Sequence, residues 1–297
     1  MKVWLQACRV NSLLISSVGV TVGSAVALHD GRFNVLRFVL AWLGSVLIQA
    51  GTNMTNVFYN YKALAADPAF DPRGSSAVIR MGLLRPEQVQ RGGLLAFAGG
   101  ILCGLLLTWL CGWPILWLGV PAVAAGYFYA GPPIRYGYIA LGVVSVFIFM
   151  GPVMVGGAYY VMTQHITMAA LAAAIPIGLV AAGIMHTNDL RDYAADVVHG
   201  KKTLATLLGR RGAGYALGFM DAAAFAFIVP AAAVRVLPWP VLLVLLAVPQ
   251  AISQVRSALR ETDPKQLHQV WLRGVKLHMQ FGLLLIAGLL VATAFGI

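Results

Sequence analysis

The chain has 297 residues, of which 60% are hydrophobic and only 10% are charged. A soluble domain carries about 25% charged residues, so the composition excludes an ordinary soluble protein. The net charge is +11. No nucleic-acid-binding motif and no basic helix with interleaved aromatic residues occurs, so we expect no nucleic-acid partner. The positive charge is expected to attract anionic lipid or a polyanionic substrate.

Long apolar segments predict an all-α, polytopic membrane protein, because a helix of about 20 apolar residues crosses a lipid bilayer. Nine such helices are expected, at residues 12–29, 34–60, 92–112, 114–130, 138–162, 166–188, 213–233, 237–257 and 277–296. Together they are expected to form one transmembrane domain over residues 1–297. The polar residues 1–9 lead directly into the first span, so no separate cleavable signal peptide is expected.

The basic residues predict the orientation of these helices. Of the 21 Lys and Arg residues, only Arg32, Arg37 and Arg235 fall on one side of the nine spans. Basic residues are enriched on the cytoplasmic side of membrane proteins. We therefore expect a multi-pass protein of the inner (plasma) membrane, whose N-terminus and active-site mouth face the cytoplasm.

The stretch NDLRDYAADVVHGKK, residues 188–202, follows the sixth apolar segment and holds three of the ten acidic residues. Asp189, Asp192 and Asp196 have i, i+3, i+7 spacing, which places them on one face of a helix. Carboxylates on one face repel each other unless a cation lies nearby, and hard oxygen ligands beside phosphate suit Mg²⁺. The alternative is a solvated loop in which these acids pair with basic neighbours, namely Arg191, Lys201 and Lys202.

The second apolar segment ends in a similar way, with the stretch IQAGTNMTNVFYNYK. Asn53, Asn56 and Asn60 repeat the i, i+3, i+7 spacing. The two matching ends, four spans apart, predict an internal pseudo-repeat with a cavity between its halves. An amide oxygen is a weaker Mg²⁺ ligand than a carboxylate, and the alternative is that the asparagines only form hydrogen bonds within the bundle.

A basic loop follows each triplet. Arg73, Arg80 and Arg85 in the first loop are suited to hold phosphate oxygens through paired N–H groups. Lysines and arginines in the second loop offer the same charge. No Walker-type glycine-rich loop occurs, so nucleotide hydrolysis is not expected.

Five stretches carry a resemblance to known proteins: GTNMTNVFYNYK, RGSSAVIRMGLLRPEQV, YFYAGPPIRYGYIALGVVSVFIFMGPVMVGGAYYVMT, NDLRDYAADVVHGKKTLATLLGR and VKLHMQFGLLLIAGLL. They span nearly the whole chain. Through them the chain resembles the UbiA superfamily of intramembrane prenyltransferases, and within it the 1,4-dihydroxy-2-naphthoate prenyltransferases of menaquinone synthesis.

The resemblance implies nine helices around a central cavity, with two polar motifs that hold Mg²⁺ and a polyprenyl diphosphate at the cavity mouth. It implies transfer of the polyprenyl group to an aromatic quinone precursor, with the isoprenoid tail toward the lipid bilayer. Asp189, Asp192 and Asp196 are then the catalytic and metal-binding residues. The substrate-binding residues that we expect are Asn53, Asn56, Asn60, Lys62, Arg73, Arg80, Tyr129, Arg135, Asn188, Lys201 and Lys202.

Other polar and aromatic residues have two interpretations each. Aromatic faces stabilise cations, so Tyr129, Tyr136 and Tyr138 are candidates to stabilise an allylic cation, or they anchor the protein at the membrane interface. His186 and Asp221 lie next to or within apolar helices. Each is interpreted either as functional or as a hydrogen-bonding residue of the bundle.

The chain departs from the family pattern in its first motif. The family carries aspartates at the positions of Val57 and Asn60, and here both acids are absent. We therefore expect one firm Mg²⁺ site at Asp192 and Asp196, assisted by Asp189, with the asparagines contacting diphosphate or water on the metal. Two further functions stay open: a prenyltransferase or cyclase with another acceptor, and a non-catalytic protein that binds an isoprenoid lipid.

Overall fold

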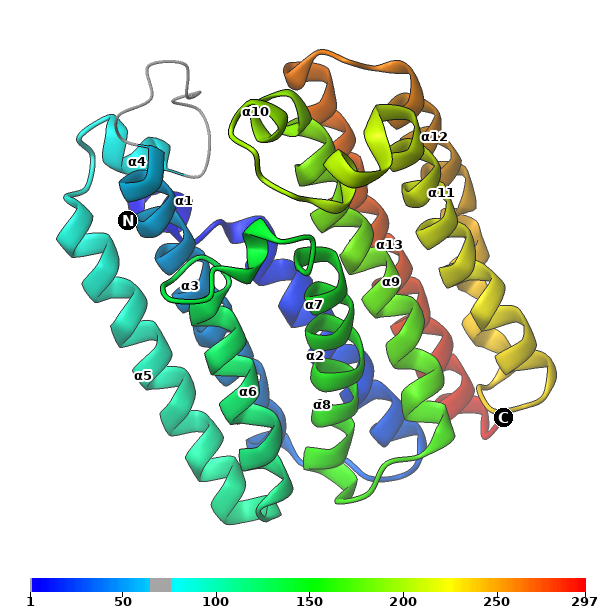
Figure 1. Cartoon of the computed structure of the whole chain (residues 1–297). Coiled ribbons are helices and arrows are strands. Elements are labelled where there is room, and N and C mark those ends of the chain that lie inside the picture. Colours follow the sequence, from blue (N-terminus) through cyan, green and yellow to red (C-terminus); the bar gives the residue numbers. More distant parts are fainter. Residues whose placement is uncertain (1, 65–75) are drawn as a thin grey trace. The chain divides into compact units, whose positions relative to one another are not determined.

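The computed structural model describes residues 2–64 and 76–297, and these contain helices and no β-strand (Figure 1). Its Cα positions divide the chain into two compact units. The first unit comprises Met1–Ser17 and Val39–Tyr138, and the second comprises Val18–Phe38 and Ile139–Ile297. The chain passes between the units at three places, and two of these lie within long helices, α2 (Val10–His29) and α3 (Val35–Leu64).

Eight helical stretches in the described residues are long and apolar enough to cross a membrane. They confirm the expected all-α, multi-pass class. The ninth expected helix, at 114–130, is present as α6 (Pro114–Phe128), whose 15 residues make it shorter than the others. The eight spans are Val10–His29, Val35–Ala63, Pro86–Cys111, Gly142–Thr163, Met168–Arg191, Leu204–Ala233, Trp239–Arg260 and Pro264–Phe295.

The first unit contains the helical hairpin of α5 (Pro86–Cys111) and α6, with the short helices α1 (Lys2–Ala7) and α4 (Ala77–Arg80). A proline at the first position of α5 supplies a preset φ and needs no hydrogen-bond partner for its nitrogen. Gly112 ends α5 at φ 91°, in the region that favours glycine. The chain reverses direction after Gly112, and α6 packs against α5.

The second unit is built around α9 (Met168–Arg191), which packs against the helices on either side of it in the chain and against the last helix. These partners are α7 (Gly142–Ile148), α8 (Met154–Thr163), α11 (Leu204–Ala233) and α13 (Pro264–Phe295). The remaining elements are α10 (Tyr193–Val198), a 3-10 helix (Trp239–Ala247) and α12 (Val248–Arg260). α9 is therefore the central helix of this unit.

A π-helical segment, Phe149–Val153, joins α7 to α8 within one span. Pro152 cannot donate a backbone hydrogen bond, and a π-bulge accommodates such a residue without ending the helix. Beside it, Gly151 meets Gly178 of α9 so closely that a Cβ on Gly151 would lie 2.8 Å from the Gly178 Cα. The missing side chains therefore let the two backbones touch.

Three helices begin earlier than the hydropathy pattern predicts: α5 at Pro86 rather than 92, α11 at Leu204 rather than 213, and α13 at Pro264 rather than 277. Within α11 the backbone leaves the helical region at Gly209 (φ 72°, ψ 167°), so the residues from Leu204 to Leu208 form a short helix that is separated by a kink from the longer part of the span. Each extension contains charged residues, which lower the hydropathy of the segment but do not oppose helix formation. Thr203 and Asp263 mark the true starts of α11 and α13, since each side chain accepts a hydrogen bond from the backbone N–H three residues ahead. Capping, and not hydropathy, determines these ends.

The Gly151–Gly178 contact predicts that a single methyl group at this position destabilises the protein. In Gly178→Ala the new Cβ would lie 2.7 Å from the Phe147 carbonyl oxygen. Because backbone atoms are difficult to displace, we expect a loss of about 1–3 kcal/mol, measured as a lower Tm in detergent. Gly104→Ala in α5 is the matched control. It meets nothing within 4 Å, so it is expected to leave Tm unchanged or raise it through helix propensity.

Candidate active site

The aspartate segment lies where α9 ends and α10 begins. Asp192 separates the two helices, yet its N–H donates to the Asn188 carbonyl at 3.0 Å, and the Asp196 N–H donates to the Asp192 carbonyl at 2.8 Å. The first is the last bond of α9 and the second is the first bond of α10, and Asp192 itself, at φ −89° and ψ 2°, interrupts the helix between them. The prediction of one continuous helix face for the three aspartates is therefore wrong, because Asp189 lies on α9, Asp192 at the break and Asp196 on α10.

The three side chains have different environments. Asp189 is 5% exposed and Asp196 is 8% exposed, whereas the Asp192 side chain is 44% exposed. Arg191 donates two hydrogen bonds to the Asp192 carboxylate, from Nε at 2.8 Å and from Nη2 at 2.7 Å. Asp192 is thus already paired at the surface, while the other two carboxylates are buried in the second unit.

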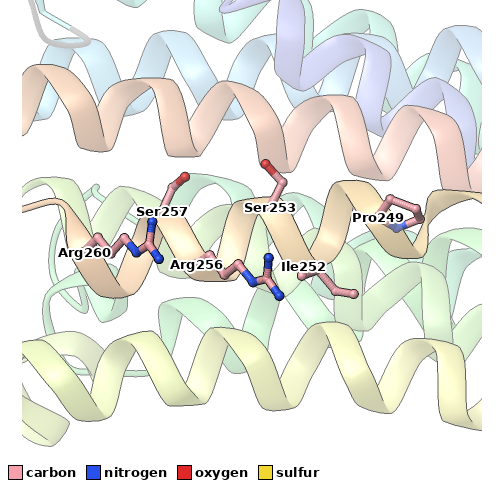
Figure 2. Close-up of a pocket in the computed structure, with 6 residues that line it drawn as sticks. All are labelled: Pro249, Ile252, Ser253, Arg256, Ser257 and Arg260. Atoms are coloured by element: carbon pink, nitrogen blue, oxygen red, sulfur yellow. The ribbon is translucent and has the colours of Figure 1, made fainter.

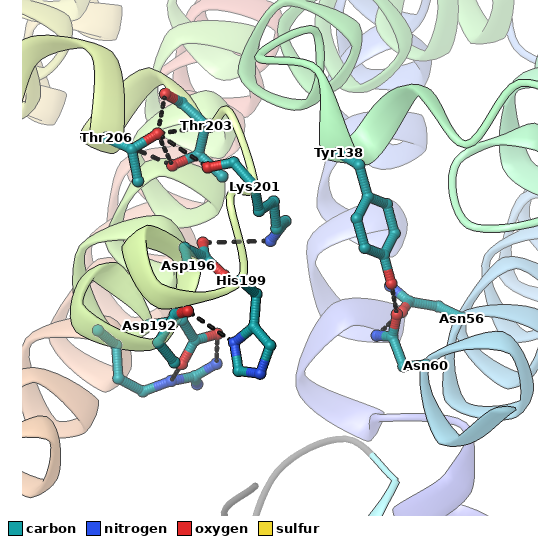
Figure 3. Close-up of polar contacts among 11 residues, drawn as sticks. Asn56, Asn60, Tyr138, Asp192, Asp196, His199, Lys201, Thr203 and Thr206 are labelled. Atoms are coloured by element: carbon teal, nitrogen blue, oxygen red, sulfur yellow. Dashed lines mark hydrogen bonds and ion pairs between the residues drawn. The ribbon is translucent and has the colours of Figure 1, made fainter. Parts of the chain in front are cut away.

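Lys201 lies against the buried pair. Gly200, at φ 66°, turns the chain after α10, and the Lys201 Nζ then lies 3.3 Å from Asp196 Oδ2 (Figure 3). Burial raises the pKa of Asp196, and the nearby Lys201 opposes part of this rise. Burial also acts to lower the pKa of Lys201, but the carboxylates of Asp196 and Asp189 outweigh it and raise that pKa above its usual value.

The backbone after Lys201 is held in place by the start of α11. Thr203 and Thr206 exchange hydrogen bonds at the N-cap, and the Thr206 hydroxyl also donates to the Lys201 carbonyl at 3.1 Å (Figure 3). Lys202 is exposed and its backbone forms an isolated bridge with Ile139. Of the three basic partners named for a solvated loop, Arg191 and Lys201 therefore pair with aspartates, and the Lys202 side chain forms no hydrogen bond or ion pair with the described residues.

A divalent cation fits the chemistry of this segment. Its three carboxylates carry more negative charge than Arg191 and Lys201 neutralise. In addition, the Asn188 Oδ1 is buried and lacks a hydrogen-bond partner in the described chain. No three His, Cys, Asp or Glu side chains within residues 2–64 and 76–297 converge enough to hold a metal alone. Mg²⁺ usually takes only one or two carboxylates and completes its shell with water and substrate phosphate.

The asparagine segment lies on α3 in the first unit. Asn56 and Asn60 are hydrogen-bonded side chain to side chain, and the Tyr138 hydroxyl donates to Asn60 Oδ1 at 2.7 Å (Figure 3). Asn53 is 4% exposed. Its amide donates to the Cys8 carbonyl at 2.8 Å and its oxygen accepts from Gln49 at 3.2 Å. Asn53 therefore has packing partners, while Asn56 and Asn60 form a neutral network with a tyrosine.

The other expected substrate-binding residues of the first unit are spread over several elements. Lys62 lies with its Nζ 4.7 Å from the centre of the Phe58 ring. Arg80 ends α4, and Arg135 is exposed in the loop after α6. The Tyr129 ring packs edge-on against Tyr136, with ring centres 5.4 Å apart. Arg73 lies outside the described residues.

His199 is a residue near the site that sequence reasoning missed. It follows α10, and its positive charge lowers the pKa of Asp196, although less than burial raises it. Its Nδ1 lies 2.7 Å from the Ala195 carbonyl (Figure 3). The signal was present in the sequence, since His199 stands three residues after Asp196 and so shares its helix face.

Two of the polar residues inside apolar helices behave differently in the second unit. His186 Nε2 lies 2.8 Å from the Ala213 carbonyl, which fits a hydrogen bond between α9 and α11. Both carboxylate oxygens of Asp221 are buried, and they have no hydrogen-bond partner in the described part of the chain. His186 therefore follows the structural interpretation, and Asp221 does not yet have a partner that explains it.

The model of the UbiA prenyltransferase family matches residues 17–281. The chain belongs to this family. That assignment covers both polar segments and all the spans up to the last helix.

Several relatives of this UbiA-family chain have names or solved structures. A 1,4-dihydroxy-2-naphthoate octaprenyltransferase of Bacillus subtilis is 28% identical over 288 residues, which cover 97% of this chain and 92% of the relative. An apo structure of a UbiA homolog from Aeropyrum pernix K1 has a TM-score of 0.68 at 19% identity, over 93% and 96% of the two chains. A UbiA homolog from Archaeoglobus fulgidus, bound to GPP and Mg²⁺, has a TM-score of 0.62 at 14% identity, over 96% and 99%. These structures share the fold of this chain.

The Lys201–Asp196 ion pair predicts that replacing Lys201 lowers the stability of the protein and that replacing the neighbouring Lys202 does not. Lys201→Met leaves two buried carboxylates without their ammonium, and breaking such a pair costs up to about 3 kcal/mol. We expect a lower Tm in metal-free buffer and partial recovery when Mg²⁺ is added. Lys202→Met removes the same charge one residue away, where the side chain is exposed. An equal loss of Tm in both variants would contradict the assigned role of Lys201.

Proposed function

We propose that this UbiA-family protein transfers a polyprenyl group from a polyprenyl diphosphate to 1,4-dihydroxy-2-naphthoate in menaquinone biosynthesis. One observation carries the proposal. Two buried carboxylates, Asp189 and Asp196, interact with one ammonium, that of Lys201, at the end of a membrane span, and the adjacent residue in the chain, Asn188, has a buried side-chain oxygen without a hydrogen-bond partner in the described residues. The name of the Bacillus subtilis relative, which matches nearly the whole chain, supports the choice of substrate.

Asp189, Asp196 and the Asn188 oxygen are the residues that would hold Mg²⁺, with Asp192 available once Arg191 releases it. When bound, Mg²⁺ supplies positive charge that stabilises the diphosphate as it leaves. The Aeropyrum and Archaeoglobus homologs share the fold, and the latter was solved with GPP and Mg²⁺, which supports the same cofactor here. The end of the span then holds the diphosphate at the membrane surface, proposed to be the cytoplasmic one.

Lys201 has a second role in this proposal. Because its pKa is raised, its ammonium stays protonated at neutral pH and can donate to a diphosphate oxygen. As the bond between the allylic carbon and the diphosphate oxygen breaks, negative charge builds up on that oxygen. A fixed ammonium beside it lowers the barrier, because a preorganised charge needs no rearrangement during the reaction.

The first unit offers neutral groups for the same substrates. Asn56, Asn60 and Tyr138 form a hydrogen-bonded set that is suited to bind oxygen atoms without adding charge. The faces of Tyr129 and Tyr136 are suited to stabilise an allylic cation. For a naphthoate acceptor, attack by the electron-rich ring is followed by loss of its carboxylate. We propose these roles for the first unit without assigning a proton acceptor to it.

A second candidate function is supported by the residues of the first motif. Where relatives carry acids, this chain has Val57 and Asn60, and Asn60 is engaged by Asn56 and Tyr138. A protein with this neutral motif could bind an isoprenoid diphosphate without transferring it. The experiment that follows separates the two functions.

Turnover is tested with the purified protein, Mg²⁺, a series of polyprenyl diphosphates and 1,4-dihydroxy-2-naphthoate. Asp196→Asn should lower the rate at least about 100-fold, because a carboxylate that would hold Mg²⁺ is lost, and with it the positive charge that stabilises the leaving diphosphate. Asp263→Asn is the matched control, since Asn is an equally good cap for α13. If the wild type forms no product with any prenyl chain but binds diphosphate in a Mg²⁺-dependent manner, the non-catalytic function holds instead.

The raised pKa of Asp196 predicts how Mg²⁺ binding depends on pH. A carboxylate must be deprotonated to bind a metal, so protons compete with Mg²⁺ at higher pH than for an ordinary Asp of pKa 3.8. In the metal-free protein, an acid with a raised folded-state pKa contributes stability that is lost as pH rises through that pKa. The Tm increase caused by Mg²⁺ should therefore be larger at pH 7.5 than at pH 5. An equal increase at both pH values would show that Asp196 is not a ligand.

A further inference from the structure

A hollow of about 460 Å³ runs along one face of α12 in the second unit (Figure 2). Its residues recur every three or four positions, which is the spacing of a single helix face. One end is apolar and the other end is basic. The lining residues are Pro249, Ile252, Ser253, Arg256, Ser257 and Arg260.

Arg273 of the neighbouring α13 organises the polar side of this hollow. Its Nη1 donates to the Ser253 hydroxyl at 3.3 Å and to the Ser257 hydroxyl. Gln250 ties the same two helices together by donating to the Arg273 carbonyl at 3.3 Å. A hydroxyl that accepts from a guanidinium keeps its own hydrogen to donate. The two serines therefore offer donors, and the hollow has no acidic side chain in its lining.

Arg256 and Arg260 are exposed, and neither forms an ion pair or hydrogen bond with the described residues. This distinguishes them from Arg210, whose guanidinium donates to two backbone carbonyls. They stand four residues apart, so their Cα atoms are separated by about 6 Å along the helix. Two guanidiniums at this spacing, with hydroxyl donors beside them, match a phosphate group.

The apolar end of the hollow indicates which phosphate compound fits. α12 is the second half of a candidate membrane span, Trp239–Arg260. Ile252 is 46% exposed, and Leu246 farther along the span is also exposed. Such residues face lipid in a membrane protein. From Pro249 to Arg260 the helix rises about 16 Å, so one face leads from lipid-facing apolar residues to unpaired arginines at the end of the span.

We propose that this hollow binds the headgroup phosphate of an anionic phospholipid. Arg256, Arg260 and the serine hydroxyls hold the phosphate, and an acyl chain lies over Ile252 and Pro249. A free phosphate or diphosphate has no apolar group that could contact the apolar half of the hollow. Each Lys or Arg near the membrane surface strengthens the binding of anionic lipid about fivefold. The site lies outside the aspartate segment and is independent of prenyl transfer.

The test is native mass spectrometry of the full chain in detergent, titrated with dioleoyl phosphatidylglycerol. The wild type should bind it with a measurable Kd and bind dioleoyl phosphatidylcholine much more weakly. Arg256→Gln/Arg260→Gln should weaken phosphatidylglycerol binding about 25-fold. Lys265→Gln/Lys276→Gln is the matched control, because it removes the same charge from exposed positions of α13. It should change the Kd less than twofold.

Three outcomes would overturn the proposal. The first is an equal loss of binding in the two double variants, which would indicate attraction to general positive charge. The second is equal binding of the two phospholipids by the wild type, a comparison that needs no variant to fold. The third is displacement of phosphatidylglycerol by inorganic phosphate or diphosphate at millimolar concentration, which would show that the hollow takes a soluble anion.

Discussion

Two carboxylates buried beside a single ammonium impose the main constraint on the second unit. Removing an ion from water costs several kcal/mol, and only a well-placed counter-charge offsets that cost. Lys201 provides it for Asp189 and Asp196, and its place depends on the turn at Gly200 and the cap at Thr203. The polar end of this membrane-embedded unit is therefore determined by a short loop and not by the spans themselves.

The packing of α9 gives that loop a rigid support. α9 meets the π-helical segment at a contact between Gly151 and Gly178, and it donates or accepts through His186 toward α11. Small residues let helices approach closely in membranes, where no hydrophobic driving force acts between them. Asp189 stands at the end of α9, and Asp192 and Asp196 follow it directly, so the packing of α9 positions the start of the aspartate segment.

The polar side chains of the two segments find their partners in different ways. The asparagines satisfy one another and Tyr138 through neutral hydrogen bonds, which need no counter-ion. The aspartates require cations, and they obtain them from Arg191, Lys201 and, in the proposed function, Mg²⁺. In this member of a prenyltransferase family, the negative charge of the two polar segments is thus concentrated in the aspartate segment. In the proposed function, the second unit therefore carries the charge-dependent step.

The amino-acid sequence by itself determined the helical class, the approximate positions of the spans, the family resemblance and the spacing of both polar triplets. These follow from hydropathy and helical periodicity, which are local properties of the chain. It did not determine the early starts of α5, α11 and α13, because charged residues lower the hydropathy of a segment without preventing it from forming a helix. Only the tertiary structure decided that Asp192 is held at the surface by Arg191 while Asp189 and Asp196 are buried with Lys201. Burial and pairing depend on how a loop folds back onto a helix end, and residue spacing carries no information about that return.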